Sequence, residues 1–340
     1  MSESTLSLSI SDLQIAVAKE MGIGGTAAAW SAEDVLTIAR TIKKGLRQFY
    51  FPPQFDPNER PHQWSFLKPV CSLTTVAPYS TGTIAIALAG TIVTLTTGVW
   101  PSWAATNGTI VINNVEYAIA SRNIDGVHIT LSAAWTLTTE TAATYILYHD
   151  GNYDLPDDFG GIEGNITYAD ESSYKGDIVL VGEGMIRSSR SGSSDSSLSS
   201  YPTMAAVRPK EQTTMTTGQR FEIMLYPTPD AAYVLNYRKV ILPQMLVDTT
   251  LTHPYGGMIH AETIEASCCA IVEMQDNDKR GGKRLWDYFL TRLSASIQAD
   301  KRICGQEIFG YNGNSEDTYA KTRFDRNGQT CHITYNGITY

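Results

Sequence analysis

Apolar residues recur at helical spacing towards the C-terminal end of the chain. Ile264, Cys268 and Ile271 form one series, and a second series follows a polar stretch that ends in two glycines. The second series has four-residue intervals: Leu285, Phe289, Leu293 and Ile297. This spacing places each series on one face of a helix, and the glycines favour the end of the first helix. We therefore predict a hairpin of two antiparallel helices over residues 253–304.

The N-terminal region supplies further helices, which such a hairpin needs to cover its apolar faces. Ser31 and Asp34 have the spacing of a capping box, and Pro52-Pro53 marks the end of that helix. Between them, apolar residues recur at Val35, Ile38, Ile42, Leu46 and Phe49. The pattern predicts a helical bundle formed by residues 1–63 and 253–304.

A shorter helix is expected ahead of this one, from a cap at Ser11-Asp12 to about Glu20. The glycines that follow formally match a dinucleotide-binding fingerprint, Gly22-x-Gly24-x-x-Ala27. That fingerprint requires a strand before it, whereas here a helix precedes it. We interpret the glycines as a helix stop and expect no cofactor.

The middle of the chain has the pattern of β structure, and we predict an inserted β region over residues 64–252 that starts at Trp64-Ser65-Phe66-Leu67. Between residues 79 and 148, short strands are expected at Thr83–Leu88, Thr91–Thr96, Thr109–Ile112, Val115–Ala120, Val127–Leu131 and Tyr145–Tyr148. Hairpin turns are expected at Ala89-Gly90, Asn113-Asn114 and Asp125-Gly126. Segment 79–148 is therefore predicted to be a small β-barrel or sandwich module.

The remainder of the β region contains three further expected strands: Met204–Pro209, Phe221–Tyr226 and Tyr233–Leu242. The serine-dominated stretch Ser188–Ser200 has too few apolar residues to fix itself and is expected to be a flexible loop. Residues 305–340 lack core positions of their own, so we expect an extended C-terminal tail that assembles with a partner. The predicted fold class is α+β.

Charge and composition exclude some classes of protein. The formal net charge of −9 argues against a protein that coats nucleic acid. No apolar run is long enough to span a bilayer, and the N-terminus lacks a signal-peptide pattern. We expect folding in a cytosol, with the five cysteines reduced.

The densest carboxylate cluster comprises Asp154, Asp157, Asp158 and Glu163. Paired carboxylates can hydrolyse a glycan or hold a hard cation, but turn chemistry explains acids beside proline and glycine with less effort. The histidines lack metal-ligand spacing, and no phosphate-binding loop or nucleophile elbow occurs. We expect no enzyme activity and no metal. A glycan-binding or glycan-hydrolysing module, built on this cluster and on Trp100 with Trp103, is the alternative from a different class.

One side of the predicted N-terminal helix is basic, through Arg40, Lys43, Lys44 and Arg47. Two interpretations of this basic face stay open. It is either a solvated helix face or a contact with an acidic partner surface.

Several motifs occur in a distinctive order along the chain. They are Trp30-Ser31-Ala32-Glu33-Asp34, Gly45-Leu46-Arg47-Gln48-Phe49-Tyr50-Phe51-Pro52-Pro53, His62-Gln63-Trp64-Ser65-Phe66-Leu67, Tyr153-Asp154-Leu155-Pro156-Asp157-Asp158-Phe159, Tyr226-Pro227-Thr228-Pro229-Asp230, Pro254-Tyr255-Gly256-Gly257, His260-Ala261-Glu262, Gly310-Tyr311-Asn312-Gly313 and Tyr335-Asn336-Gly337. As an ordered set, which covers most of the chain in pieces, they resemble the head-to-tail adaptor (connector) proteins of tailed bacteriophages.

The resemblance implies a structural virion protein without catalytic activity. Such proteins form a ring, here expected to hold twelve copies, beneath the capsid portal, and join it to the tail. The ring continues the DNA channel, through which DNA passes without specific binding, and no membrane is involved. The protein would be assembled in the cytoplasm of the host bacterium and reside in the neck of the virion. Alternatively, it is a tail nozzle, stopper or tail-tube component.

The residues expected to contact the portal come from the tail and from the basic face. They are Tyr311, Asn312, Tyr335, Asn336, Tyr340, Arg40, Lys43, Lys44 and Arg47.

Overall fold

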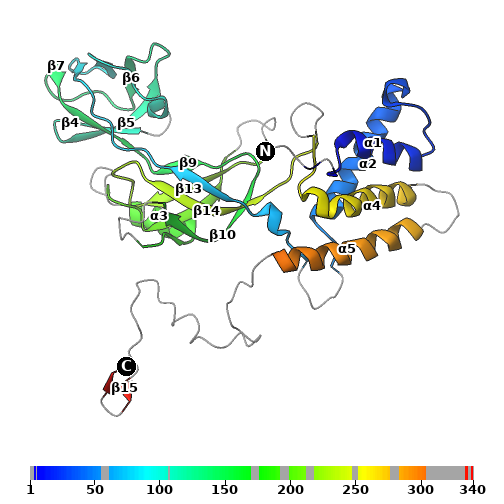
Figure 1. The fold of residues 1–340 in the computed structure, drawn as a ribbon. Helices are drawn as coiled ribbons and strands as arrows, with labels where there is room; N and C mark the ends of the chain where they lie inside the picture. Colours follow the sequence, from blue (N-terminus) through cyan, green and yellow to red (C-terminus); the bar gives the residue numbers. More distant parts are fainter. Residues whose placement is uncertain are drawn as a thin grey trace. The chain divides into compact units, whose positions relative to one another are not determined.

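The computed structural model describes residue 4 and residues 6–54, 61–105, 108–169, 176–191, 199–211, 218–246, 252–275 and 283–303, with the backbone of 334–335 and 338–339. Within them the fold is mixed α+β, with five α-helices and several largely antiparallel sheets. The chain divides into two compact units (Figure 1). Unit 1 comprises Met1–Pro69 and Val240–Ala320, and unit 2 comprises Val70–Lys239 and Lys321–Tyr340. The sequence had placed the ends of the β region at residues 64 and 252.

Unit 1 contains four α-helices from the two ends of the chain. They are α1 (Ile10–Glu20), α2 (Ala32–Tyr50), α4 (Gly257–Gln275) and α5 (Arg284–Ile303), with short 3-10 helices at Ala27–Ala29 and Ser65–Leu67. Residues of all four helices, together with Trp64, Leu67 and Leu246, form one hydrophobic core. None of the helices in the described ranges is long and apolar enough to cross a membrane.

Two local predictions in unit 1 were wrong. Ser9, and not Ser11-Asp12, caps α1, and Asp12 is the acidic partner three residues later in this capping box. Trp64–Leu67 does not start β structure, because Ser65–Leu67 is a 3-10 helix that directs Trp64 and Leu67 into the core. The predicted Ser31 cap of α2 is confirmed, although Val35 is exposed.

Helix α4 lies at the centre of unit 1. The sequence predicts one apolar face for this helix. In the structure, the consecutive residues from Ala266 to Ala270 are all buried, so the middle of α4 is buried on every side. Helices α1, α2 and α5 each contact α4, which explains why five consecutive residues in its middle are buried. Thr263 hydrogen-bonds Ser296, and Glu273 accepts from the backbone N–H of Leu285, so α4 and α5 are antiparallel as predicted.

Helices α2 and α4 approach each other closely at Gly45. A Cβ atom at Gly45 would lie 2.6 Å from the Cα and Sγ atoms of Cys268. The backbone carbonyl of Gly45 accepts a hydrogen bond of 2.8 Å from the hydroxyl of Ser267. Only glycine permits this approach of the two backbones.

In unit 2, segment 79–148 forms one curled antiparallel sheet of seven strands, in the order β7-β2-β3-β6-β5-β4-β8 (Figure 1). The strands are β2 (Ile84–Ile86), β3 (Ile92–Leu95), β4 (Gly108–Ile112), β5 (Val115–Arg122), β6 (His128–Leu131), β7 (Glu140–Ala143) and β8 (Tyr145–His149). Six of them match predicted strands, and β7 was missed because its sequence, Glu-Thr-Ala-Ala, lacks an apolar alternation. Within the described strands no ladder joins β7 to β8, so the sheet is open.

The predicted hairpin turn between β4 and β5 is confirmed in detail. Asn113 and Asn114 both have positive φ angles, 51° and 62°. Asparagine tolerates this backbone, and two such residues give the twist that a two-residue hairpin requires. The inner face of the curled sheet covers Trp100 and Trp135, which are each 1% exposed.

Unit 2 also contains two smaller sheets. One has the order β1-β14-β10, with β1 (Val70–Thr74), β14 (Val234–Ile241) and β10 (Phe159–Tyr168). The other has the order β11-β12-β13-β9, with β11 (Val179–Leu180), β12 (Met204–Pro209), β13 (Phe221–Tyr226) and β9 (Asn152–Asp154). The strand predictions at β12, β13 and β14 are confirmed.

Helix α3 (Glu183–Arg190) was not predicted, and it overlaps the expected loop Ser188–Ser200. Its only buried residue, Ile186, packs against Ala206 and Met224 of the four-stranded sheet. Residues 192–198 of the expected loop lie outside the described residues. In the predicted tail, the structure describes only β15 (Thr334–Tyr335) and β16 (Ile338–Thr339), which pair antiparallel.

His149, at the end of β8, is a buried histidine that is neutral in the fold. Its ring stacks on Tyr153 at 4.5 Å between centroids, and its Nδ1 accepts a hydrogen bond of 3.0 Å from the N–H of Gly151. Burial, reinforced by the nearby charge of Arg190, lowers the pKa of His149 from 6.5 to about 4.

We expect Gly45→Ala to lower the free energy of unfolding by about 1–3 kcal/mol, because the added methyl group meets the backbone of α4. Gly24→Ala is the matched control, since a Cβ atom at that position would have no other atom within 4 Å. Urea denaturation of both variants measures the difference. Equal stability would show that α2 and α4 do not approach at Gly45.

We also expect acid to destabilise unit 2 through His149. Because the unfolded chain takes up this proton at pH 6.5 and the folded chain does so only near pH 4, stability present above pH 6.5 is lost as pH falls to about 4. The loss is about 3 kcal/mol. Denaturant titrations between pH 4 and 7 should show a smaller decline in His149→Gln, and the full decline in His128→Gln. Identical pH profiles for His149→Gln and the unmodified chain would contradict this assignment.

Candidate partner-binding site

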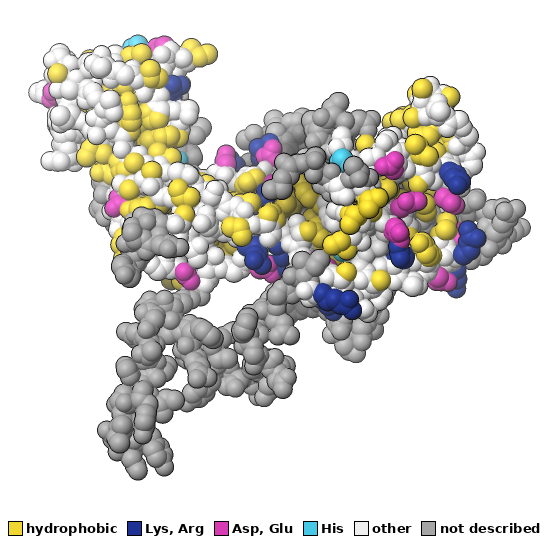
Figure 2. Space-filling view, in the orientation of Figure 1, with side chains coloured by type: hydrophobic (Ala, Val, Ile, Leu, Met, Phe, Trp, Pro, Cys, Tyr) yellow, Lys and Arg dark blue, Asp and Glu magenta, His cyan; other side chains and the backbone are white. Residues whose placement is uncertain are grey.

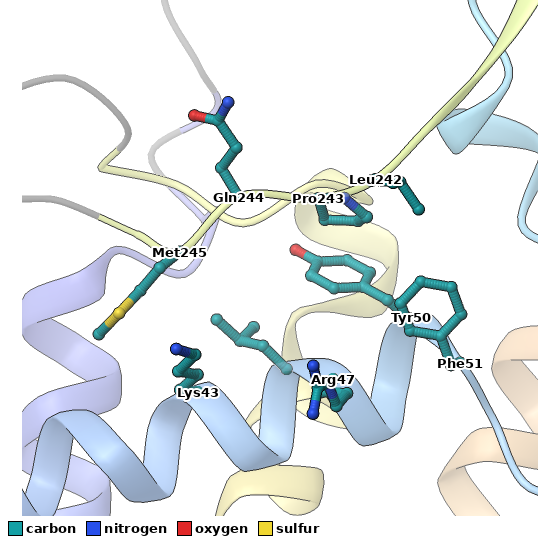
Figure 3. A pocket seen from close by; sticks show the side chains of 9 residues that line it. Lys43, Arg47, Tyr50, Phe51, Leu242, Pro243, Gln244 and Met245 are labelled. Carbon is teal, nitrogen blue, oxygen red and sulfur yellow. The ribbon is translucent and has the colours of Figure 1, made fainter. Parts of the chain in front are cut away.

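A surface pocket of about 330 Å³ lies beside the C-terminal half of α2 (Figure 3). One wall is α2 and the residue after it, with Lys43, Leu46, Arg47, Tyr50 and Phe51. The other wall is the extended segment Leu242-Pro243-Gln244-Met245, which follows β14. Both walls belong to unit 1. We call this feature the α2 pocket.

The α2 pocket combines positive charge with exposed apolar surface. Lys43 and Arg47 are exposed, and neither forms an ion pair with a carboxylate in the described part of the chain. Phe51, Leu242 and Met245 are 58%, 43% and 42% exposed. Large apolar side chains gathered beside charged ones are typical of a surface that binds another chain.

The second wall also offers backbone groups. Gln244 and Met245 belong to no strand, and their backbone groups form no hydrogen bond with another described residue. In Figure 3 the side chain of Gln244 points away from α2, and Pro243 lies next to the ring of Tyr50. An extended peptide can pair with such a free edge, and the side chains along that edge give specificity.

The four cations of the predicted basic face fall into two pairs in the structure. All four cations are exposed on α2, but only Lys43 and Arg47 line the α2 pocket. Arg40 and Lys44 lie outside it. We call these two residues the open pair. They are spaced four residues apart, as Lys43 and Arg47 are, which makes each pair a control for the other.

Four of the expected partner-binding residues in the tail, Tyr311, Asn312, Asn336 and Tyr340, lie outside the described residues. Tyr335 is described by its backbone alone, in β15. The sequence did not predict that Phe51 and the segment 242–245 line a site. The signal was weak, since Leu242 and Met245 flank the end of an ordinary strand pattern.

In the carboxylate cluster 154–163, acids pair with cations. Three of its acids each contact a different cation: Asp154 contacts Lys210 at 2.7 Å, Asp157 contacts Arg220 at 2.8 Å, and Asp158 contacts Lys239 at 2.7 Å. Lys239 is buried, so its partner carboxylate compensates a charge that would otherwise be costly. The described residues hold no group of three or more His, Cys, Asp or Glu that could bind a metal ion.

The two tryptophans proposed for glycan binding have structural contacts. Trp100 is 1% exposed, and its indole N–H donates to the carbonyl of Val127 at 2.8 Å. Trp103 packs edge-on against His149. A sugar-stacking platform requires exposed ring faces, which Trp100 does not offer.

One polar group in unit 1 brings together residue types of nucleophilic enzymes. Asp300 is 2% exposed, and it accepts hydrogen bonds from the hydroxyl and N–H of Ser65 and contacts Nε2 of His62 at 2.9 Å. In a catalytic triad the histidine lies between the serine and the acid. Here the carboxylate lies in the middle, and this arrangement ties the loop before β1 to the end of α5.

Comparison with known proteins does not assign the chain to a family. No family model matches it, and no curated protein matches its sequence.

We expect the acids of the cluster to contribute to stability in proportion to the burial of their partners. Asp158→Ala leaves the buried Lys239 unpaired and should cost about 3 kcal/mol of unfolding free energy. Asp157→Ala breaks an exposed pair with Arg220 and should cost less than about 1 kcal/mol. Urea denaturation of both variants measures the two costs, and equal costs would contradict the structural role of Asp158.

Proposed function

We propose that this protein is a head-to-tail adaptor, a structural component of the virion of a tailed bacteriophage. In this proposal it forms a ring of twelve copies under the capsid portal, joins the portal to the tail and continues the DNA channel. It has no catalytic role. The helices α1, α2, α4 and α5 then correspond to the helical bundle of the adaptor, and the curled sheet is its inserted β module.

The observation that carries the proposal is the convergence of the motifs that resemble the adaptor family. Phe49, Trp64 and His260 come from three separate motifs, yet the Trp64 ring lies 4.6 Å from that of Phe49 and 5.1 Å from that of His260, between centroids. The indole of Trp64 donates to the carbonyl of Phe49 at 2.8 Å. The N–H of Tyr255 donates to the hydroxyl of Tyr50 at 2.9 Å.

The motifs of unit 2 also contribute buried residues. Tyr153, Leu155 and Phe159 belong to one hydrophobic core, on which the strand β13 also packs. The motif that starts at Tyr226 follows β13, with a cis peptide bond before Pro227 and a buried Thr228. In unit 1, motifs far apart in the sequence therefore meet in one packing centre, and in unit 2 the motif that starts at Tyr153 contributes to one of the cores. This supports a resemblance in fold, from which function is an analogy.

Exposed apolar residues on the helices of unit 1 support assembly into a larger complex. They include Ile15, Leu36, Met258, Ile259, Met274 and Tyr288, all of which are more than half exposed or close to it. Figure 2 shows hydrophobic side chains at the surface among the charged ones. Such patches are frequent where subunits meet.

The sequence assigned all four cations of the basic face to the portal contact. Because Lys43 and Arg47 line the α2 pocket, within this proposal we keep the open pair for that contact, together with the tail residues Tyr311, Asn312, Tyr335, Asn336 and Tyr340. The net charge of −9 per copy supports a channel wall that repels DNA, so that DNA slides through without specific binding.

The test is electron microscopy of the purified protein with and without its portal. We expect a ring, alone or on the portal, whose symmetry can be counted. The double variant Arg40→Glu/Lys44→Glu should weaken portal binding about tenfold or more, since like charges across an interface are costly. Lys19→Glu, on α1, is the control. A monomer that ignores the portal and binds tail proteins would indicate a nozzle, stopper or tube component instead.

A further inference from the structure

We infer that the α2 pocket binds an acidic stretch of this protein's own C-terminal tail, Glu316-Asp317-Thr318-Tyr319. The inference concerns a contact within or between copies of this chain. It does not depend on the adaptor assignment.

The charges of the α2 pocket and of the tail segment are complementary. Lys43 and Arg47 are one helical turn apart and lack a carboxylate partner among the described residues. In the 37 residues after Ile303, Glu316-Asp317 is the only place where two acidic residues are adjacent. The segment therefore brings two negative charges to a pocket with two positive charges, and one of the carboxylates can pair directly with Lys43 or Arg47.

The pattern of side chains in an extended peptide also fits the α2 pocket. In extended backbone, Asp317 and Tyr319 project to the same side. A carboxylate and an aromatic ring spaced in this way match a pocket that has cations at Lys43 and Arg47 and exposed apolar groups at Phe51 and Met245. The backbone groups of Gln244 and Met245, which form no hydrogen bond with another described residue, can pair with the peptide backbone.

The chain between α5 and the acidic segment is long enough for this contact. Helix α5 ends at Ile303 in the same unit as the pocket. The residues between Ile303 and Glu316 can span up to about 40 Å when extended. Asp300, near the end of α5, accepts a hydrogen bond from Ser65, and the neighbouring Trp64 donates to Phe49 of α2. The end of α5 therefore lies near the C-terminal half of α2, and the segment can reach the pocket on its own copy or on a neighbouring copy.

The test is a photo-crosslinking experiment on the full-length chain. A benzophenone amino acid replaces Met245, which is exposed at the rim of the pocket, and irradiated protein is digested with trypsin. We expect cross-links to the tryptic peptide 303–321, which holds the proposed segment. Cross-links confined to other peptides, or an absence of cross-links, would overturn the proposal.

Charge variants give the second readout. In the cross-linking chain, Lys43→Glu/Arg47→Glu should lower the yield about tenfold, while the open-pair variant Arg40→Glu/Lys44→Glu should stay within about twofold. Adding Glu316→Lys/Asp317→Lys to the pocket variant should restore the yield. An unchanged yield in the pocket variant, or no rescue in a variant with the circular dichroism of the unmodified chain, would contradict the proposal.

Mixing isotopically heavy and light protein shows which copy supplies the segment. Cross-links between heavy and light peptides show that the segment comes from a neighbouring copy. Cross-links only between peptides of the same mass show that it comes from the same copy. Either result supports the tail segment as the occupant of the α2 pocket. Because ring formation and portal binding are measured separately by microscopy, failure of this proposal leaves the proposed function to its own test.

Discussion

The contact between α2 and α4 is the constraint on which the rest of the structure depends. It joins residues 222 positions apart. The hydroxyl of Ser267 donates a hydrogen bond to the carbonyl of Gly45, and Cys268 occupies the space that a side chain at position 45 would need. Because α2 and α4 are held in one core, the chain between them must leave that core and return to it. It does so through neighbouring strands, since β1 pairs antiparallel with β14 and Val70 lies opposite Arg238. Close helix packing in unit 1 and the insertion of the β region are therefore consequences of the same contact.

Where local patterns decide the structure, the sequence was sufficient. The alternation in Val234–Ile241 and the paired asparagines at 113–114 specify a strand and a turn by their own chemistry, and both predictions were confirmed. Where tertiary contacts decide, the sequence was insufficient. Strand β7 lacks apolar alternation and forms because β2 offers an edge, and α3 is anchored by the single buried residue Ile186.

The same distinction explains what could be predicted of the candidate site. The exposure of the cations on α2 followed from helical periodicity, since they lie opposite the apolar face. The pocket could not be predicted, because its second wall comes from residues 242–245, nearly two hundred positions later. Its formation requires the path of the chain from β14 back into the helical core, where Leu246 is buried. A site between segments so far apart becomes visible only when the fold is known.

Charge pairing differs between the carboxylate cluster 154–163 and helix α2 in a way that folding alone does not require. In unit 2 the acids at 154, 157 and 158 each have a cationic partner on a neighbouring segment. On α2 the cations Lys43 and Arg47 have no such partner among the described residues, although acidic residues outnumber basic ones in the chain, 35 to 26. Exposed cations cost little in water, so they do not destabilise the helix. Their position beside the exposed side chains of Phe51 and Met245 requires an explanation. Burial of such apolar surface stabilises a protein, and this burial requires that a further segment, of the same chain or of another, covers it.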